Sequence, residues 1–407
     1  MIPPGADTVL VRHGELGTKS SQVQHRMERL LGGNIDRMLT ERQIEGTVSG
    51  EHGRLYVRGK PAELSRVLDA VTDTVGVISA SPAVRTAPTM EAITSALGTI
   101  ASDVHTGGTF AVRARRAGGP DAHAFTSQEI EREGGSAIWA TVDTPEVDLD
   151  HPDHTYYVEC RPDTAYIFIE KQPGPGGFPY GSQGTVVALI SGGIDSPVAA
   201  WEMMRRGCQI VPLYFDFEDY GGPDHIARAY ESVRHLAQYA PDGRLDLVHV
   251  PIGSVVEELC ESTQATRMLS LRRFMFSVAE QIADREGAHS LSTGESLGQK
   301  SSQTGTNLAV GGAHLRYPIH RPLLAMDKQE IIDRAKTLGT FQDATIDAGC
   351  NRVAPSLPET AANLADVLAA EPPGLLRHVE DVTAESHTKT LSRHEEAPAV
   401  IAPNGQS

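Results

Sequence analysis

The sequence is poor in cysteine and has no long apolar run. It contains only Cys160, Cys208, Cys260 and Cys350, and no two of them form a Cys-x-x-Cys pair. This spacing argues against a disulfide framework and a zinc ribbon. No apolar run approaches the ~18 residues of a membrane-spanning helix, and the first residues lack the basic and then apolar layout of a signal peptide. We therefore expect a cytoplasmic protein that does not contact membranes.

Lysine is also scarce, while acidic residues are abundant. The chain has 7 lysines, 29 arginines and 53 acidic residues, which gives a formal net charge of −17. This balance is typical of the solvated acidic surface of a salt-adapted protein. It counts against general nucleic-acid binding, which needs a basic footprint. Any contact with RNA must therefore depend on local groups of arginines.

One such group lies on the segment from Thr109 to Arg115, which alternates in the manner of a strand. Arg113 and Arg115 share one face of this strand, and Arg116 follows at its end. The three side chains are candidates for contacts with RNA phosphates. The alternative interpretation is a solvated edge strand whose charges protect it from pairing.

The stretch TVVALISGGIDSPVAA, residues 185–200, predicts a strand, a tight loop and a helix. The run from Val186 to Ile190 has the composition of a strand buried on both faces, and Pro197 opens an apolar helical segment. Gly192 and Gly193 allow the backbone to approach a ligand, and the first N–H groups of the helix point into the turn without partners. An anion is the natural occupant of such a loop.

The side chains around this loop could add to the site. Ser191 and Ser196 supply hydroxyl donors, and Asp195 could orient a metal or a bound group. The simpler alternative is an ordinary glycine turn between a strand and a helix.

What the loop lacks is a lysine. No Gly-Lys-Ser/Thr follows the glycines, so this is not the Walker A loop, whose lysine reaches the β- and γ-phosphates. The string Ser-Gly-Gly-x-Asp-Ser after a buried strand instead resembles the PP-loop of the ATP pyrophosphatase families, which cut ATP to AMP and pyrophosphate. By this resemblance, the loop would hold the pyrophosphate that leaves.

The order of predicted elements indicates an α/β protein with several parts. Short strands and helices alternate over residues 7–171 in the rhythm of small α+β modules. A segment dense in glycine and proline then follows from Lys171 to Gly184 and is expected to be a linker. After it, strands alternate with helices as in a parallel sheet covered on both faces. The expected parts are residues 1–75, 76–172, 173–385, and a disordered polar tail at 386–407.

Two later segments carry polar groups that suit a ligand site. The loops after the strands ending near Ile190, Phe215 and Ser292 should face one pocket, because ligands bind beyond the carboxyl ends of parallel strands. The third of these loops, Thr293 to Thr304, is rich in glycines, hydroxyls and amides. Cys350 follows a glycine outside any periodic apolar segment and is either a reactive thiol or a buried packing residue.

With both polar loops in place, the chain resembles the tRNA 4-thiouridine synthetase family, which is also named for sulfur transfer in thiamine biosynthesis. The resemblance includes Arg12-His-Gly-Glu15, Val112-Arg-Ala-Arg115 and Thr126-Ser127. It implies a ferredoxin-like domain and an RNA-binding THUMP domain, followed by a doubly wound PP-loop domain with a parallel sheet. The matching regions cover nearly all of the chain up to residue 360.

The resemblance implies an ATP-dependent tRNA sulfurtransferase. In this family, O4 of uridine at position eight of tRNA attacks the α-phosphate of ATP and expels pyrophosphate, and sulfur then displaces AMP. ATP and Mg²⁺ are the implied cofactors, and tRNA and a sulfur donor are the implied partners. Asp195 falls at the PP-loop aspartate, and Cys350 at the cysteine that takes part in sulfur transfer. The residues implied to bind ATP are Leu189, Ile190, Ser191, Gly192, Gly193, Ser196, Tyr214, Phe215, Arg272, Gly294 and Gln303.

Two departures from the family leave the sulfur donor open. Many bacterial members add a rhodanese-like domain, and some archaeal members carry a CxxC where this chain has Met268-Leu-Ser-Leu271. The donor is therefore either an external persulfide carrier or free sulfide. A homodimer and a role in thiamine synthesis also stay open. The competing functions are a different AMP-forming PP-loop ligase or amidotransferase, and a non-catalytic RNA-binding protein.

Overall fold

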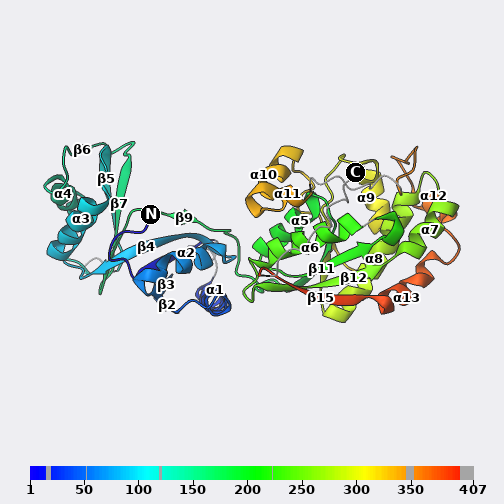
Figure 1. Ribbon diagram of the computed structural model, residues 1–407, viewed down its shortest axis with the longest axis horizontal. Coiled ribbons are helices and arrows are strands. Elements are labelled where there is room, and N and C mark those ends of the chain that lie inside the picture. The colour runs from blue at the N-terminus through cyan, green and yellow to red at the C-terminus, as the bar shows by residue number, and fades with distance from the viewer. Residues whose placement is uncertain (15–19, 52, 119–121, 222, 345–352, 395–407) are drawn as a thin grey trace, which may run out of the picture. The chain divides into compact units, whose positions relative to one another are not determined.

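The computed structural model describes the chain except for residues 15–19, 52, 119–121, 222, 345–352 and 395–407. The described residues divide into two compact units, Met1–Pro179 and Tyr180–Ser407, and Figure 1 labels most of their helices and strands. We call them the N-terminal unit and the C-terminal unit and describe each by itself.

The first half of the N-terminal unit is an antiparallel sheet in the order β2-β3-β1-β4, packed against two helices. Val9 and Val11 of β1 pack with Leu31 and Ile35 of α1, whereas Leu10 faces the other side of the sheet, because successive side chains of a strand alternate. The elements are β1 (Thr8–His13), α1 (Ser21–Glu41), β2 (Gly46–Glu51), β3 (Arg54–Gly59), η2 (Pro61–Glu63), α2 (Leu64–Asp73) and β4 (Val77–Thr86).

Strand β4 joins this half to the second half of the unit. Its residues 77–83 pair with β1 and its residues 84–86 pair with β8, so the sheet continues in the order β4-β8-β7-β5-β6. Apolar side chains of α3 and α4, such as Leu97 and Ile130, pack with Phe110 and Tyr156 of the sheet. The elements are α3 (Met90–Val104), β5 (Thr109–Arg116), α4 (Ser127–Trp139), β6 (Glu146–Val147), β7 (His154–Cys160), β8 (Ala165–Phe168) and β9 (Gln172–Pro173).

The glycine- and proline-rich segment begins inside the N-terminal unit. Strand β9 pairs with β4, and the N–H groups of Gly174 and Gly176 donate to the carbonyl oxygens of Ile78 and Val77. A Cβ at Gly174 would lie 2.5 Å from the Val77 carbonyl oxygen, so a glycine is needed there. The division between the units therefore falls after Pro179 rather than after Gln172.

The C-terminal unit is built on a sheet in the order β14-β13-β10-β11-β12-β15, in which only the pairing of β12 with β15 is antiparallel among the described strands. Its elements are β10 (Thr185–Ile190), α5 (Asp195–Arg205), β11 (Gln209–Asp216), η3 (Glu218–Tyr220), α6 (Pro223–Ala237), β12 (Arg244–Pro251), α7 (Gly253–Ser262), α8 (Arg267–Glu286), β13 (Ser290–Ser292), η4 (Ser301–Gln303), α9 (Gly305–Gly312), β14 (Ile319–His320), α10 (Lys328–Leu338), α11 (Phe341–Ala344), α12 (Leu364–Ala370), η6 (Leu375–Arg377), α13 (His378–Glu385) and β15 (His387–Ser392).

The start of α5 differs from the sequence prediction. The helix begins at Asp195, so Pro197 is its third residue rather than its first. This costs no hydrogen bond, because the first turn of a helix has no acceptors for its N–H groups. Strand β10 is buried along Val186 to Ala188, as predicted for a strand covered on both faces.

The prediction of a disordered tail from residue 386 is wrong for its first part. Residues His387–Ser392 form β15, which pairs with β12 from Arg244 to His249. The segment is polar because most of its side chains are exposed, yet Leu391 is fully buried. The backbone of β12 supplies the partners that an edge strand needs, which a count of apolar residues does not reveal.

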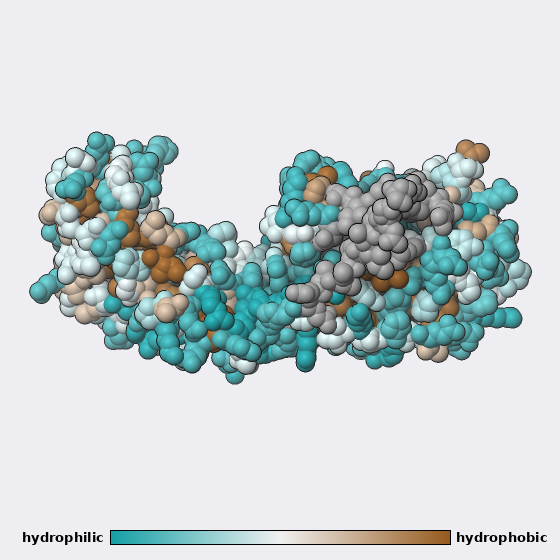
Figure 2. Space-filling view, in the orientation of Figure 1, coloured by the Kyte–Doolittle hydropathy of each residue, from teal (hydrophilic) through white to brown (hydrophobic). Residues whose placement is uncertain are grey.

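Both the surface drawn for the C-terminal unit and the described helices agree with the charged composition of the chain and with its lack of long apolar runs. Hydrophilic side chains cover much of the face of the C-terminal unit drawn in Figure 2. Of the helices that the structure describes, none combines the length and the apolar character needed to cross a membrane.

Candidate active site

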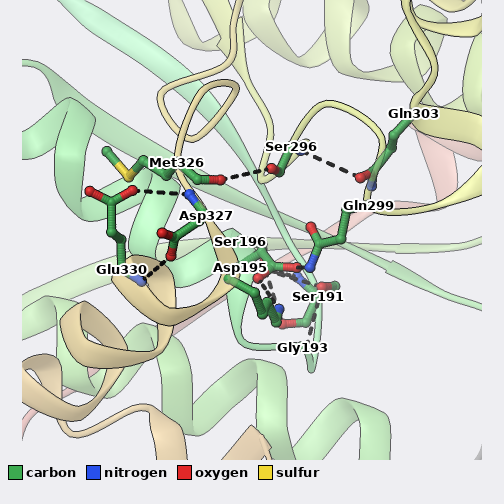
Figure 3. A network of polar contacts seen from close by, with 11 residues as sticks. Ser191, Gly193, Asp195, Ser196, Ser296, Gln299, Gln303, Met326, Asp327 and Glu330 are labelled. Carbon is green, nitrogen blue, oxygen red and sulfur yellow. Dashed lines mark hydrogen bonds and ion pairs between the residues drawn. The ribbon is translucent and has the colours of Figure 1, made fainter.

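The loop between β10 and α5 is held in shape by its own serines. The Ser196 hydroxyl oxygen accepts from the Ser191 N–H (2.8 Å) and donates to the Ser191 carbonyl oxygen (3.2 Å). The Gly193 N–H lies 3.3 Å from the Ser191 hydroxyl oxygen, and these contacts are drawn in Figure 3. The serines therefore brace the loop backbone, so its remaining N–H groups are the main donors for an anion.

Gly294 presses the loop that follows β13 against the start of α5. A Cβ at this position would lie 2.7 Å from the Ser196 nitrogen and 2.8 Å from the carbonyl carbon of Asp195. Both atoms belong to backbone and cannot move aside. The predicted ATP-binding glycine is therefore also a packing requirement that joins the two predicted ligand loops.

Asp195 lies between two polar groups from distant segments. Its Oδ1 pairs with Nζ of Lys328 (2.6 Å), and its Oδ2 accepts from Nε2 of Gln299 (3.2 Å; Figure 3). Lys328 opens α10, whose capping box joins Asp327 and Glu330. The sequence prediction did not include Lys328 in the site. The signal that could have pointed to it is that lysine is scarce in this chain and that Lys328 stands at the start of a helix with a capping box.

The second polar loop is braced by Gln303, another predicted ATP-binding residue. Gln303 is nearly fully buried, and its Oε1 lies 3.4 Å from the Ser296 N–H. The Ser296 hydroxyl donates to the Met326 carbonyl oxygen (3.2 Å; Figure 3). This network connects the loop after β13 to the segment that leads into α10.

Arg272 belongs to a charged group around the buried carboxylate of Glu295. Its Nη1 forms an ion pair with Glu295, whose other oxygen accepts from Nε of Arg321 (2.7 Å) and from the Thr293 hydroxyl (3.0 Å). Burial, with a contribution from Arg321, lowers the pKa of Arg272 to about 10, so it is charged at neutral pH. Two guanidinium groups share one carboxylate, which leaves a surplus of positive charge in this group.

The remaining predicted ATP contacts lie at the ends of β10 and β11. Ile190 pairs with Tyr214 in the parallel ladder, and the side chains of Ile190, Tyr214 and Phe215 are buried, while Leu189 packs against the core from a partly buried position. The Tyr214 ring meets the edge of His249 (5.4 Å between centroids). For the three buried residues, the backbone is the part that can face a ligand.

The N-terminal unit has a separate cleft of about 870 Å³ that is rich in cations. Arg113 and Arg115 line it, as their shared face predicted. Arg116 is not among the lining residues in the described part of the unit, and its Nη1 donates to the Phe125 carbonyl oxygen (2.6 Å). Cations that sequence reasoning did not assign to the site also line the cleft, namely Arg12, Arg54 and Lys171.

Aromatic rings support two of these cations. The rings of Tyr157 and Phe168 stack at 5.0 Å, with Nζ of Lys171 over Tyr157 (4.0 Å) and the Arg12 guanidinium over Phe168 (4.7 Å). Burial and the nearby Arg54 lower the pKa of Arg12 to about 10. Such stacks hold long side chains in place at a surface. They were not recognisable in sequence because the residues come from three separate strands and a loop.

Comparisons with known proteins cover both units. Family models match residues 8–81 (ThiI ferredoxin-like domain), 87–170 (THUMP domain) and 181–373 (Thiamine biosynthesis protein, ThiI). A "Probable tRNA sulfurtransferase" of Halobacterium salinarum is 51% identical over 389 residues, which span 95% of this chain and 98% of the relative. The chain belongs to the ThiI family. The predicted family and its order of domains are thereby confirmed.

Two further proteins are similar to this chain over most of its length. A tRNA sulfurtransferase of Pyrobaculum aerophilum is 37% identical over 338 residues, which span 83% of this chain and 67% of the relative. The crystal structure of a 4-thiouridine synthetase–RNA complex with bound ATP matches with a TM-score of 0.84 and 26% identity, over 95% of this chain and 100% of that chain. The fold class predicted from the sequence, an α/β chain whose last domain has a parallel sheet, is confirmed.

Cys350 lies outside the described residues. The segment that follows residue 352 is anchored: Arg267 donates from Nη1 to the Val353 carbonyl oxygen (3.2 Å), and the Glu359 N–H donates to the Ala265 carbonyl oxygen (3.0 Å). Burial raises the pKa of the Cys160 thiol to about 11 and also raises that of Cys208. These two thiols are therefore poor nucleophiles at neutral pH.

Proposed function

We propose that this protein is an ATP-dependent tRNA sulfurtransferase that converts the uridine at position eight of tRNA to 4-thiouridine and releases AMP and pyrophosphate. The observation that carries the proposal is the braced loop at the N-terminus of α5, held by Ser196 and Gly294. It occurs in a chain with 51% identity to a relative named as a tRNA sulfurtransferase. Because tRNA is the substrate, we place the protein in the cytoplasm.

The first chemical step belongs to the C-terminal unit. O4 of the uridine attacks the α-phosphate of ATP, the bond to the β-phosphate breaks, and pyrophosphate leaves. The N–H groups of the loop bind the departing anion, since helix N-termini favour negative charge. The surplus positive charge around Arg272 and Arg321 stabilises the charge that develops on the α-phosphate.

Magnesium is proposed to accompany ATP. No group of three or more metal-binding side chains occurs among the described residues. The Asp195 carboxylate lies at the loop, where Lys328 and Gln299 contact it, and an ion that replaced one of these contacts would be held by one carboxylate together with substrate phosphates. The ion would neutralise phosphate charge there.

RNA is proposed to bind the cleft of the N-terminal unit. The chain as a whole has a net charge of −17, yet this cleft gathers arginines and a lysine. Stacked aromatic rings and cations are the groups that bind unpaired nucleotides and phosphates. Of the three arginines that the sequence proposed as RNA contacts, Arg113 and Arg115 line the cleft and stay proposed contacts. Arg12, Arg54 and Lys171 join them.

Sulfur enters in the second step. We propose that sulfide, or the outer sulfur of a persulfide carrier, attacks C4 of the adenylated uridine, so that the C4–O bond breaks and AMP leaves. After attack by a persulfide, a thiol then attacks the carrier's sulfur, so that the S–S bond breaks, the outer sulfur stays on C4 and the thiol and the carrier form a disulfide. Cys350 is proposed to take part in this transfer. A Cys350→Ser variant is then expected to release pyrophosphate at the wild-type rate but to form no 4-thiouridine. An unchanged rate of thiolation would remove Cys350 from the mechanism.

The test of the function is nucleoside mass spectrometry on tRNA from a deletion strain. We expect 4-thiouridine to be absent, to return with the wild-type gene, and to return to a lower level with an Asp195→Ala gene. Purified protein given ATP with tRNA, small acids or ammonia separates this function from that of another AMP-forming ligase. If 4-thiouridine persists in the deletion strain, the proposal is wrong.

A further inference from the structure

Arg228 is a buried arginine that lies against the loop between β10 and α5. It comes from α6 and is 7% exposed. Its side chain crosses Gly192, because a Cβ at that glycine would lie 3.0 Å from Cβ and 3.2 Å from Cδ of Arg228. Its Nη1 is 3.5 Å from the Gly192 carbonyl oxygen. Its Nε and Nη2 are buried and have no hydrogen-bond partner among the described residues.

Other buried arginines of the C-terminal unit are paired with carboxylates. Arg273 pairs with Glu371 (2.7 Å), and Arg234, on the same helix as Arg228, pairs with Glu231. For Arg228, no carboxylate lies within ion-pair distance in the described part of the chain. A buried cation without a partner destabilises a fold, and buried charges are almost always paired. The compensating negative charge is therefore expected to come from an anion that binds at the loop and leaves.

The peptide bond between Gly192 and Gly193 connects Arg228 to the ligand side of the loop. The bond is trans, so its C=O and N–H point in opposite directions. A guanidinium on the carbonyl side turns the Gly193 N–H toward the opposite side, where its acceptor is the Ser191 hydroxyl oxygen (3.3 Å) until an anion takes that place. It also polarises this N–H, since hydrogen-bonded groups in series strengthen one another. Gly192 permits this arrangement because it has no Cβ to collide with Arg228.

We infer that Arg228 is a positioning residue that provides, from behind the loop, the positive charge that binds pyrophosphate. Arg228 thereby takes the place of the lysine that a Walker A loop would supply and that this loop lacks. The inference rests on the proposed function, in which this loop holds the leaving pyrophosphate. It adds a residue from α6 to a site that the sequence assigned to the loops after three strands.

Stability and binding are expected to respond in opposite directions when Arg228 is replaced. Arg228→Met keeps an unbranched apolar stem but removes the charge. Without ligand, the full-length variant should unfold at the wild-type temperature or above it, because an unpaired buried charge is gone. Its Kd for inorganic pyrophosphate with Mg²⁺ should rise by about tenfold. The KM for ATP in AMP formation should rise more than kcat falls, and Arg228→Lys should recover part of the loss.

Arg234→Met is the matched control on the same helix. It removes a buried arginine whose carboxylate partner, Glu231, remains, so its unfolding temperature should fall while its pyrophosphate affinity stays at the wild-type value. Arg228→Met with a lower unfolding temperature and unchanged pyrophosphate affinity would make Arg228 a structural residue, and so would a failure to fold. If the wild-type protein binds neither pyrophosphate nor ATP, the proposed function fails as well.

Discussion

The two units present groups for anions in different ways. In the N-terminal unit, long cationic side chains such as Arg115 and Lys171 line an open cleft on one face of a sheet. In the C-terminal unit, the donors are backbone N–H groups of one short loop, and the loop is pinned by backbone contacts such as that of Gly294 with α5. The first arrangement is spread over many side chains, and the second is concentrated at one turn.

This difference indicates what each unit is suited to bind. Separate cations suit a long polyanion, because each phosphate contact adds a similar, salt-dependent share of the affinity. A braced loop suits one anion in one position, because its donors are fixed before the ligand arrives. Substitutions should therefore have graded effects in the N-terminal unit and severe effects in the C-terminal unit.

The severest effect is expected from Gly294→Ala. The new Cβ would meet the backbone of Asp195 and Ser196 at less than 3 Å, so the two loops must separate. We expect AMP formation to fall by about a hundredfold, as for a misplacement of about 1 Å, while RNA binding is unchanged. Gly305→Ala, with no atom within 4 Å of its Cβ, is the control. If Gly294→Ala keeps more than half of the wild-type rate of AMP formation, the contrast between severe effects in the C-terminal unit and graded effects in the N-terminal unit is wrong.

Asp195→Ala should have the next largest effect. It frees Lys328 and Gln299, which now hold the Asp195 carboxylate. We expect the rate of AMP formation to fall by about tenfold, the value of one lost hydrogen bond to a charged group. RNA affinity, measured by filter binding, should stay the same. Asp333→Ala, which removes an exposed carboxylate of α10 that pairs with Lys336, should leave both measurements unchanged.

Arg115→Gln tests the graded behaviour of the N-terminal unit. We expect RNA affinity to fall by roughly threefold to tenfold and the slope of log K against log salt to decrease by about one. AMP formation from saturating tRNA should not change. Arg116→Gln is the comparison, because Arg116 donates to the Phe125 carbonyl oxygen. It should lower the unfolding temperature without changing the salt slope, and equal effects of the two variants on RNA affinity would contradict the assignment of the cleft.

The smallest effect is expected from pH in the C-terminal unit. Burial lowers the pKa of His249, against the opposing influence of Asp216. The contribution of a neutral buried histidine to stability is present above the unfolded pKa of about 6.5 and is lost as pH falls through the lower folded value. The acid-induced decrease in unfolding temperature should be smaller by about 2 °C in His249→Gln. An acid-induced decrease in His249→Gln as large as that of the wild-type protein would contradict this prediction.

Local patterns were sufficient for several elements. The capping box at Asp327 and Glu330 and the buried strand before Ser191 depend on neighbouring residues, and both are present in the structure. The start of α5 was misplaced because a proline is accepted at any position of the first turn. Strand β15 was missed because its stability comes from pairing with β12 rather than from its own apolar residues.

Residues that act through distant partners could not be predicted in this way. Lys328 meets Asp195 across more than a hundred positions of sequence, and Arg228 meets Gly192 from another helix. Arg116 was grouped with Arg115 because they are adjacent, although only Arg115 lines the cleft. No local pattern contains this information, because it depends on how helices and loops pack on the sheet.

The sequence by itself determined the family, the order of the domains and the loop at Ser191–Ser196, since these depend on composition, alternation and short motifs. Only the tertiary structure decided which charges surround each site. A strand or a turn follows from neighbouring residues, whereas the field at a binding site is the sum over side chains that folding brings together from the whole chain.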